Sequence, residues 1–527
     1  MRVLLINPHY PLSENPSPPL GLSCLGAALE AAGITVRLVD YVVYPYTRTH
    51  LARVLEDFDP ALVGVTAVTM TLDHALCILS DVKQTAPHCK TVIGGPHVSF
   101  RAEQTMQHCP AIDFVVFGEG DETLPALARA IAAGRHPAKV AGIAFRSGGT
   151  VETTGPRPLV KAIDSLPTPA RHLIPVGRYR ALGLPVSMIT SRGCPFNCIF
   201  CVGRKMAGST VRRRDPRRVV DEMAGLAALD FRQINIADDL FTASAPHCRA
   251  ICREIIQRGL SVHWTAFARV DTVTAPLLAE LKAAGCSALS FGVESGNAAM
   301  LRRIRKGITT EQACRAVQMT ADSGIAPQVS FILGLPGETP ESLNDTLHLA
   351  ERLKNMGAQH GFHLLAPFPG TDVRENRHQY DLQILSHRWQ DYHANRAVTR
   401  TAAVSRGMLD HIVIQWEAQF NQWLGELKQQ RENGGNDERV WPLTHLEHVV
   451  LMHAWMMRSV IERKGIFPRP ASALSDRQGR QQLADGIAHD SGADAGQIDR
   501  TLAYAVERGY LTTEVSKGRI VWKWKND

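Results

Sequence analysis

The chain has 527 residues, of which 45% are hydrophobic and 21% charged, and its formal net charge is +7. This length allows two or three domains with sizeable cores, so neither disulfides nor metals are needed to stabilise the fold. The charge is mild and does not by itself require a nucleic-acid partner. The basic runs VRRRDPRR (211–218) and LRRIRKG (301–307) are of a kind that usually forms solvated helix faces.

The N-terminus, MRVLLINPHY, has too short an apolar run for a signal peptide and indicates a first buried strand. No apolar run approaches the roughly 18 residues that a membrane span needs, so we expect no span. The eleven cysteines are therefore expected to be reduced, and the protein to be cytoplasmic. A tight group of cysteines in that compartment indicates metal or redox chemistry before a disulfide.

Short apolar runs alternate with amphipathic helical patterns through the first 145 residues. The runs are rich in Val and Ile: RVLLIN (2–7), VRLVD (36–40), LVGVTAV (62–68), TVIGG (91–95) and FVVFGEG (114–120). Continuous apolar strands separated by helices predict a parallel sheet that is covered on both faces. We therefore expect a doubly wound, Rossmann-like α/β domain over residues 1–145, with its ligand at the carboxyl ends of the strands.

A second alternating series covers residues 186–375, after an irregular, Pro-rich linker at 146–185. Its strand candidates are SMITS (187–191), QINIAD (233–238), HWTAFA (263–268), ALSFGVE (288–294), PQVSFILG (327–334) and GFHLLAP (361–367). Six βα units predict a partial (β/α)6 barrel rather than a closed eight-fold barrel. The reacting groups should again lie at the carboxyl ends of the strands.

Residues 376–527 are predicted to be mostly helical. Residues 481–524 indicate two helices and then a hairpin around residues 517–518, which is a winged-helix-like pattern, and RENGGND (431–437) is expected to be a flexible joint before it. The second of these helices has too few basic residues to neutralise phosphates, so nucleic acid is not expected as a partner. We expect this unit to act as a substrate lid or a protein-docking module.

The stretch SRGCPFNCIFC (191–201) places Cys194, Cys198 and Cys201 in a C-x3-C-x2-C spacing, just past the first strand of the second series. Three thiolates can hold three irons of a [4Fe–4S] cluster and leave the fourth iron open to a small molecule. A structural zinc site would need a fourth protein ligand and usually paired C-x2-C units. The spacing therefore favours a cluster, and the other cysteines are expected to be small core residues.

With this motif after its first strand, the barrel region resembles the radical S-adenosylmethionine (SAM) superfamily over residues 186 to about 375. NIADDLF (235–241), FGVESG (291–296) and ILGLPGET (332–339) resemble its SAM-binding strand ends, and PFPGT (367–371) resembles a late-strand motif. The SAM contacts that the resemblance implies are Phe200, Asp238, Asp239, Glu294, Gly334 and Gly337. On the residues alone, Asp239 could instead cap a helix, and the two glycines could form a tight turn.

Residues 1–145 resemble the cobalamin-binding domain that precedes the barrel in a large radical SAM subfamily, through residues 7–33, 62–71, 93–100 and 115–124. The implied cobalamin contacts are Pro18, Leu20, Gly21, Thr66, Thr69, Met70, Gly94, Gly95, His97, Gly118, Glu119 and Gly120. No D-x-H-x-x-G loop is present, so no His is expected below the cobalt, and the loop near Thr69 and Met70 is expected there instead. Alternatively, the domain binds no corrin and only docks on the barrel; a dinucleotide site is disfavoured because G-x-G-x-x-G is missing.

Together these resemblances imply a cobalamin-dependent radical SAM enzyme with a [4Fe–4S] cluster, SAM and cobalamin as cofactors. The commonest activity implied is methylation of an unactivated carbon in a small-molecule substrate, through methylcobalamin and a 5′-deoxyadenosyl radical, with a flavodoxin or ferredoxin as electron donor. The architecture also resembles anaerobic oxidative cyclases that act on tetrapyrroles, and rearranging enzymes, which transfer no methyl group. A cobalamin-responsive DNA-binding regulator is a third hypothesis, against which the intact cysteine motif and barrel argue. No residue is identified as a catalytic acid or base.

Overall fold

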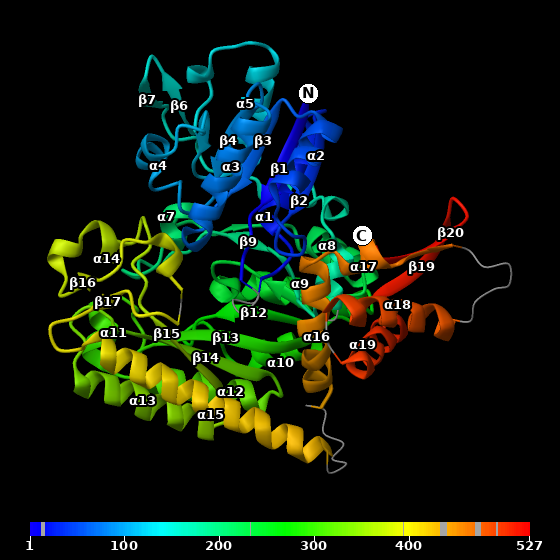
Figure 1. The fold of residues 1–527 in the computed structure, drawn as a ribbon. Helices are drawn as coiled ribbons and strands as arrows, with labels where there is room; N and C mark the ends of the chain where they lie inside the picture. Colours follow the sequence, from blue (N-terminus) through cyan, green and yellow to red (C-terminus); the bar gives the residue numbers. More distant parts are fainter. Residues whose placement is uncertain are drawn as a thin grey trace.

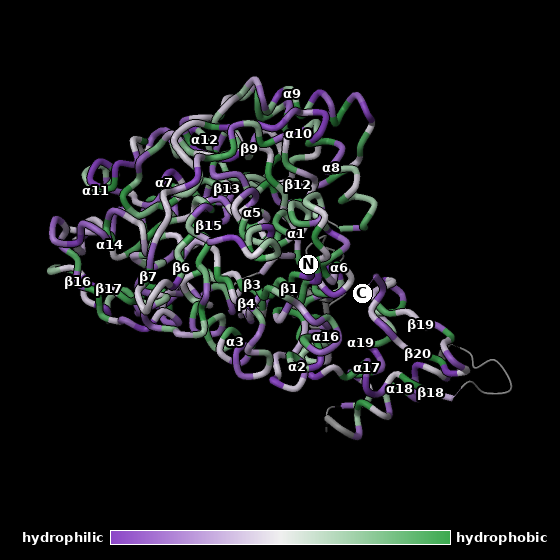
Figure 2. The backbone as a smooth tube through the Cα atoms, turned by 90° about the horizontal axis from the view of Figure 1, so that it is seen from above, coloured by the Kyte–Doolittle hydropathy of each residue, from purple (hydrophilic) through white to green (hydrophobic). Residues whose placement is uncertain are grey.

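The structure, a computed structural model, describes residues 1–11, 16–231, 233–393, 395–432, 440–468, 476–491 and 494–526. Two α/β units are stacked one above the other, and the C-terminal region extends around the lower unit, from β16 and β17 on one side through the long α15 to α16–β20 on the other (Figure 1). Viewed from above, the segment from α17 to β20 projects to one side of the two sheets (Figure 2). None of the described helices is both long enough and apolar enough to cross a membrane.

The first unit is a twisted sheet with strand order β2-β1-β3-β4-β5-β6-β7. Its parallel strands are β1 (Arg2–Asn7), β2 (Thr35–Asp40), β3 (Leu62–Thr66), β4 (Lys90–Gly94) and β5 (Phe114–Val116). In β1, Val3 and Leu5 pack in the core under α1 (Leu20–Ala31) and α5 (Gly120–Ala132). Leu4 and Ile6 pack in the opposite core, under α2 (Arg48–Phe58), α3 (Leu72–Thr85) and α4 (Ala102–His108). The doubly wound domain is thereby confirmed.

The sheet continues past residue 145, where the domain was predicted to end. Strands β6 (Ile143–Ser147) and β7 (Thr150–Thr153) extend it as an antiparallel hairpin beside β5. Most residues of β7 are exposed, so this edge strand has no apolar run for a sequence pattern to detect. The predicted linker at 146–185 therefore contains an edge strand, and it ends in the short helix α6 (Val176–Ala181).

The second unit is the predicted partial barrel, an open parallel sheet with strand order β15-β14-β13-β12-β11-β8. Its strands are β8 (Val186–Met188), β11 (Ile234–Ile236), β12 (Trp264–Ala268), β13 (Cys286–Glu294), β14 (Ala326–Leu333) and β15 (Gln359–Leu364). The covering helices are α8 (Pro216–Ala228), α9 (Ala245–Gln257), α10 (Ala275–Ala283), α11 (Ala298–Arg303), α12 (Thr310–Asp322) and α13 (Pro340–Asn355). Between β8 and α8 lie the ribbon of β9 (Ser191–Arg192) and β10 (Arg212–Arg213), and α7 (Gly203–Ala207).

The C-terminal region ends in the winged-helix-like unit that the sequence predicts. It contains α14 (Asp372–Glu375), β16 (Gln383–Ile384), β17 (Thr399–Arg400), α15 (Arg406–Glu432), α16 (Val440–Met457), α17 (Val460–Lys464), β18 (Ile466–Pro468), α18 (Asp476–Ser491), α19 (Ala495–Glu507), β19 (Leu511–Ser516) and β20 (Arg519–Trp524). Trp522 and Trp524 of β20 are buried in the core of this unit, at 4% and 0% exposed. Most of the joint expected at 431–437 lies outside the described residues.

Helix α6 is buried along its whole length and connects the three parts of the chain. The Tyr179 hydroxyl donates to Asp40 Oδ2 at the end of β2, at 2.7 Å. The Arg178 guanidinium is 1% exposed, donates to the Val43 carbonyl at 3.0 Å and pairs with Glu462 on α17. The linker therefore ends in a buried helix that is packed between the two sheets and the C-terminal region.

Asp40 should make stability depend on pH. Burial raises the pKa of this carboxyl from 3.8 to about 6, so the folded protein holds the proton more tightly than the unfolded chain. The contribution of Asp40 to the free energy of unfolding is greatest below pH 4. It falls by about 3 kcal/mol in total as the pH rises through 6. We expect Asp40→Asn to remove this decline because an amide does not titrate, so the wild type should lose about 2 kcal/mol more stability than the variant between pH 4.5 and 7.5.

Urea unfolding of the protein at pH 4.5 and 7.5 measures this effect. Asp57→Asn is the control because Asp57 is an exposed residue of α2. A variant that keeps the wild-type difference in stability between the two pH values would contradict the expectation.

Candidate active site between the two sheets

The three cysteines lie on one loop, between β9 and α7. Cys194 and Cys198 are partly exposed, Cys201 is exposed, and none of them forms a disulfide. Burial raises the pKa of the Cys201 thiol, the backbone N–H of Gly203 lowers it by donating to Sγ at 3.3 Å, and the nearby Cys194 raises it. The thiols are therefore within electrostatic reach of one another, and one of them already accepts an amide hydrogen bond of the kind that stabilises cluster thiolates.

Two carboxylates at the end of β11 hold the start of this loop. Asp238 accepts hydrogen bonds from the Thr190 N–H at 2.6 Å, the Thr190 hydroxyl at 2.6 Å and the Ser191 hydroxyl at 2.7 Å. Asp239 accepts from the Gly193 N–H at 2.8 Å. Gly193 has a φ of +111°, and a Cβ there would collide with the next segment of the loop.

The predicted Asp pair therefore divides into two roles. Asp238 is 3% exposed, and its hydrogen bonds are directed to the loop, so it is placed as a support rather than as a ligand contact. Asp239 is exposed beside the cysteines. It does not cap the following helix, because the N-cap of α9 is Ser244.

Glu294 lies at the end of β13 in a strained conformation, with a φ of +72° next to a β-bulge. Its Oε1 accepts from Lys306 Nζ at 2.8 Å, and both side chains are 8% exposed. The missing side chain of Gly292 leaves room for this ion pair, and Lys306 Nζ lies 6.0 Å from the ring centroid of Phe200 in the cysteine loop. Strain of this kind in a non-glycine residue is typical of functional sites.

Arg269 was not among the predicted site residues, although it directly follows strand β12. Its guanidinium carbon lies 3.5 Å from the ring centroid of Phe196 in the cysteine loop, and Nη2 donates to the Lys306 carbonyl at 2.8 Å. Burial raises the pKa of the Cys198 thiol, whereas the charges of Lys306 and Arg269 lower it. Two buried cations therefore favour thiolates on this loop.

Gly334 and Gly337 form a tight turn after β14, with φ values of +81° and +75°. Glu338 closes the turn by accepting from the Gly334 N–H at 2.5 Å and the Leu335 N–H at 3.3 Å. Burial raises the pKa of Glu338 to about 8. The guanidinium of Arg303 fills the space where a side chain at Gly337 would stand. The turn interpretation is confirmed, and both glycines are covered, Gly337 by Arg303 and Gly334 by Leu409 of α15.

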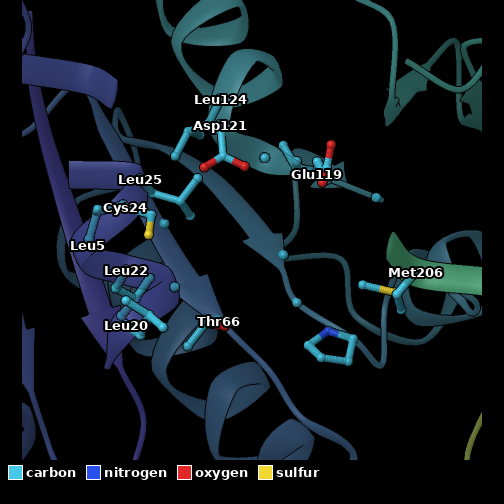
Figure 3. Close-up of a pocket in the computed structure, with 18 of the residues that line it drawn as sticks. Leu5, Leu20, Leu22, Cys24, Leu25, Thr66, Glu119, Asp121, Leu124 and Met206 are labelled. Atoms are coloured by element: carbon cyan, nitrogen blue, oxygen red, sulfur yellow. The ribbon is translucent and has the colours of Figure 1, made fainter. Parts of the chain in front are cut away.

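A cavity of about 380 Å³ lies at the carboxyl ends of the first sheet (Figure 3). Its inner part is apolar and is formed by Leu5, Leu22, Leu25, Val92, Val116 and Leu124. Gly64 of β3 adds to this part, where a Cβ would stand 3.1 Å from Leu5 and 3.3 Å from Val92. The barrel closes the other side with Ile189, Arg192, Met206 and Ala207.

Most of the predicted cobalamin contacts meet at this cavity. Its lining includes Leu20, Gly21, Thr66, Gly94, Gly95, Gly118, Glu119 and Gly120. Pro18, Thr69, Met70 and His97 lie outside the lining that the structure describes.

Trp389 of the C-terminal region lies over the loops that follow β3 and β4. His97, after β4, is 2% exposed, and its Nδ1 lies 3.2 Å from the hydroxyl of Thr69, after β3. The His97 ring meets the Trp389 ring edge to face, with 4.7 Å between the ring centroids. Burial lowers the pKa of His97 to about 4, so it is neutral at physiological pH. The sequence could not show that Trp389, almost 300 residues further along the chain, occupies this place.

An ion-pair network joins the first unit to the barrel beside the cavity. Arg192 of β9 contacts both oxygens of Asp121, at 2.8 and 3.1 Å, and Glu119 Oε1 at 3.2 Å. Arg212 of β10 contacts both oxygens of Glu119, at 2.8 and 3.0 Å. Glu119 therefore lines the cavity with its carboxylate held by two arginines.

The basic runs are less solvated than expected. Arg212 and Arg214 have side chains that are 10% and 12% exposed and pair with Glu119 and Glu222. In the second run, Lys306 is buried against Glu294. The expectation of solvated helix faces is wrong for these residues, because each of them pairs with a carboxylate that is itself largely withdrawn from solvent.

Substituting the two aspartates separately tests the division of roles. Asp238→Asn turns an amide N–H₂ toward groups that donate to the carboxylate, and we expect it to cost about 2–4 kcal/mol of stability. Asp239→Asn keeps an acceptor oxygen at an exposed position and should change stability by less than about 0.5 kcal/mol. Urea unfolding curves measure both values; equal losses would contradict the assignment of Asp238 as the buried support.

Comparisons with known proteins agree with this geometry. Residues 13–128 match the B12 binding domain family, and residues 188–350 match the radical SAM superfamily. The chain is 36% identical over 377 residues to an uncharacterized methyltransferase of Pyrococcus horikoshii, covering 71% of this chain and 81% of that protein. It is 30% identical over 439 residues to the anaerobic magnesium-protoporphyrin IX monomethyl ester cyclase of Rubrivivax gelatinosus, covering 80% of this chain and 77% of that one.

Solved structures show the same fold. The radical SAM methyltransferase TsrM from Kitasatospora setae, with cobalamin and a [4Fe–4S] cluster bound, aligns with a TM-score of 0.65 at 20% identity, over 96% of this chain and 99% of that one. The cobalamin-dependent radical SAM enzyme OxsB aligns with a TM-score of 0.70 at 18% identity, over 96% and 79%. The cysteine loop, the cavity and these relatives together show that the chain belongs to the family of cobalamin-dependent radical SAM methyltransferases.

Proposed function

We propose that the enzyme transfers a methyl group to an unactivated carbon of a small-molecule substrate, and that a flavodoxin or ferredoxin supplies its electrons. The observation that carries this proposal is the cavity shared by the two units. Its barrel side is formed by Arg192, Met206 and Ala207, which flank the cysteines in the sequence. A corrin in this cavity therefore stands next to the cluster loop.

The residues present fit the three cofactors of the family. In the proposal, Cys194, Cys198 and Cys201 hold the cluster. When bound, the cluster supplies the electron, SAM supplies the methyl group and the 5′-deoxyadenosyl radical, and cobalamin carries the methyl group to the substrate. The cluster requires reduced thiols, and thiols stay reduced in the cytoplasm, so the proposal places the protein there.

The strand ends of the barrel are assigned to SAM. Asp239 is the exposed carboxylate beside the cysteines, and Glu294 with Lys306 offers a buried pair of opposite charges at the next strand end but one. These groups suit the amino and carboxylate groups of an amino acid. The turn at Gly334 and Gly337 follows the neighbouring strand β14, and the proposal assigns its backbone to the adenine.

The cavity of the first unit suits a cobalamin in its shape and polarity. Its inner part is apolar and is deepened by Gly64, so it accepts an aromatic tail base in place of water. Its mouth is formed by backbone at Gly94, Gly95 and Gly118, where the lack of side chains lets a flat ring approach. In the proposal, the inner part would take the tail base and the glycine-lined mouth would lie against the corrin, beside the ion pairs of Glu119.

Oxidative cyclisation without methyl transfer is the second candidate, because a cyclase is among the relatives. The two reactions differ in what SAM becomes. Methyl transfer yields S-adenosylhomocysteine together with 5′-deoxyadenosine, whereas cyclisation yields 5′-deoxyadenosine alone.

Anaerobic reconstitution of the full chain tests the function. The protein is loaded with iron, sulfide and hydroxocobalamin, and then supplied with SAM, dithionite and candidate substrates. A corrin spectrum together with both SAM products, detected by mass spectrometry, is the expected result. A corrin spectrum with 5′-deoxyadenosine alone in every case would favour the cyclase, and the absence of bound corrin would refute both candidates.

Removing one cysteine should separate the two cofactor sites. We expect Cys198→Ala to lose most of its iron and all SAM cleavage while it still binds hydroxocobalamin, because the cavity is formed by other residues. Cys77→Ala is the control, since Cys77 is an exposed cysteine of the first unit. Iron content, the optical spectrum and 5′-deoxyadenosine are measured; full cleavage by the Cys198 variant would refute the cluster assignment.

Filling the cavity should have the opposite effect. Gly64→Val places branched carbons in the apolar part, where the nearest side chains already stand 3.1 and 3.3 Å from a Cβ. We expect hydroxocobalamin affinity to fall at least about a hundredfold, while iron content and the circular dichroism spectrum stay at wild-type levels. Unchanged affinity would place the corrin elsewhere.

A further inference from the structure

The backbone between Arg192 and the cysteine loop is short and hydrogen-bonded. Arg192 is the last residue of β9 and is followed by Gly193 and then by the first cysteine of the loop. The Gly193 N–H donates to Asp239, and the Cys194 N–H donates to the Gly208 carbonyl at 3.0 Å. Because both of these N–H groups are hydrogen-bonded and one residue alone separates Arg192 from Cys194, the position of Arg192 constrains that of Cys194.

The side chain of Arg192 is bound to the other unit. Its guanidinium forms a two-pronged contact with Asp121 and a third contact with Glu119, both at the start of α5. The side chains are largely withdrawn from water, at 16% exposed for Arg192, 9% for Asp121 and 11% for Glu119. A planar guanidinium that binds both oxygens of a carboxylate fixes orientation as well as distance.

These same three residues line the cavity that the proposed function assigns to cobalamin. A ligand there displaces water from one side of the ion pairs, and a lower local dielectric strengthens their attraction. The arginine is then held more firmly, and the cysteine loop with it.

We infer that Arg192 is a positioning residue that couples occupancy of the cobalamin cavity to the geometry of the cysteine loop. The inference rests on the proposed function, which places cobalamin in the cavity. Coupling between two sites is reciprocal, so a formed cluster must tighten cobalamin binding by the same factor by which cobalamin favours the cluster.

The test measures the dissociation constant of hydroxocobalamin by optical titration of the full chain, before and after anaerobic assembly of the cluster. We expect the wild type to bind about tenfold more tightly with the cluster present. Arg192→Lys keeps the charge but loses the two-pronged contact, and its ratio of the two constants should fall to near one. Arg180→Lys is the matched control: Arg180 is 7% exposed, pairs with Asp230 and lies away from this cavity, so it should keep the wild-type ratio.

A spectroscopic signature and a second variant complete the test. Cobalamin is reduced to its paramagnetic Co(II) form under the conditions that reduce the cluster, so its own signal is subtracted. Bound cobalamin should then change the electron paramagnetic resonance spectrum of the reduced cluster in the wild type, and this change should be lost in Arg192→Lys. Asp121→Asn removes the same contact from the other side and should give the same losses, including where the arginine variant does not fold.

Three results would overturn the inference. The first is a wild-type ratio of one, and the second is an Arg192→Lys variant that keeps the wild-type ratio. The third is a wild type that binds no hydroxocobalamin in either state, which refutes the proposed function as well. The first two leave the proposed function intact, so the two failures are distinguishable.

Discussion

The carboxylate of Asp238 accepts the hydrogen bonds that hold the start of the cysteine loop, and the positions of the three thiols depend on these bonds. A buried carboxylate is costly unless its oxygens are satisfied, and here the hydrogen bonds come from a backbone N–H and two hydroxyls of the segment that leads into the loop. These hydrogen bonds offset the cost of burial only while residues 190–191 keep this conformation, so they favour it. Asp239 then fixes the next peptide, at Gly193.

The second organising feature is the way the two sheets meet. Parallel strands end at one edge of each sheet, and polar groups and backbone turns gather at those edges. Here the edge of the first sheet is closed by barrel residues next to the cysteines, so each unit completes the site of the other. Two buried arginines and two carboxylates join the units at this point, and breaking one such pair would leave a charge buried without its partner.

The sequence predicts the strands, the fold of both units and the cysteine loop because these depend on local patterns. Buried parallel strands appear as apolar runs, and ligand spacing is itself a sequence feature. The edge hairpin of the first sheet is missed because β7 is polar and exposed. The roles of Arg212, Arg214 and Lys306 are missed because a basic residue looks the same whether it is solvated or paired. The cover of His97 by Trp389 depends on tertiary folding alone.

Helix α6 has a consequence for how the enzyme can move. Many enzymes that use a carrier group swing a tethered domain between separate active sites. In this chain the connection between the units is a buried helix whose tyrosine and arginine are tied to the first sheet, and the arginine is also tied to α17. A swing of the first unit would break these buried contacts together. These buried contacts therefore favour one relative orientation of the two units, in which the cavity lies beside the cysteine loop.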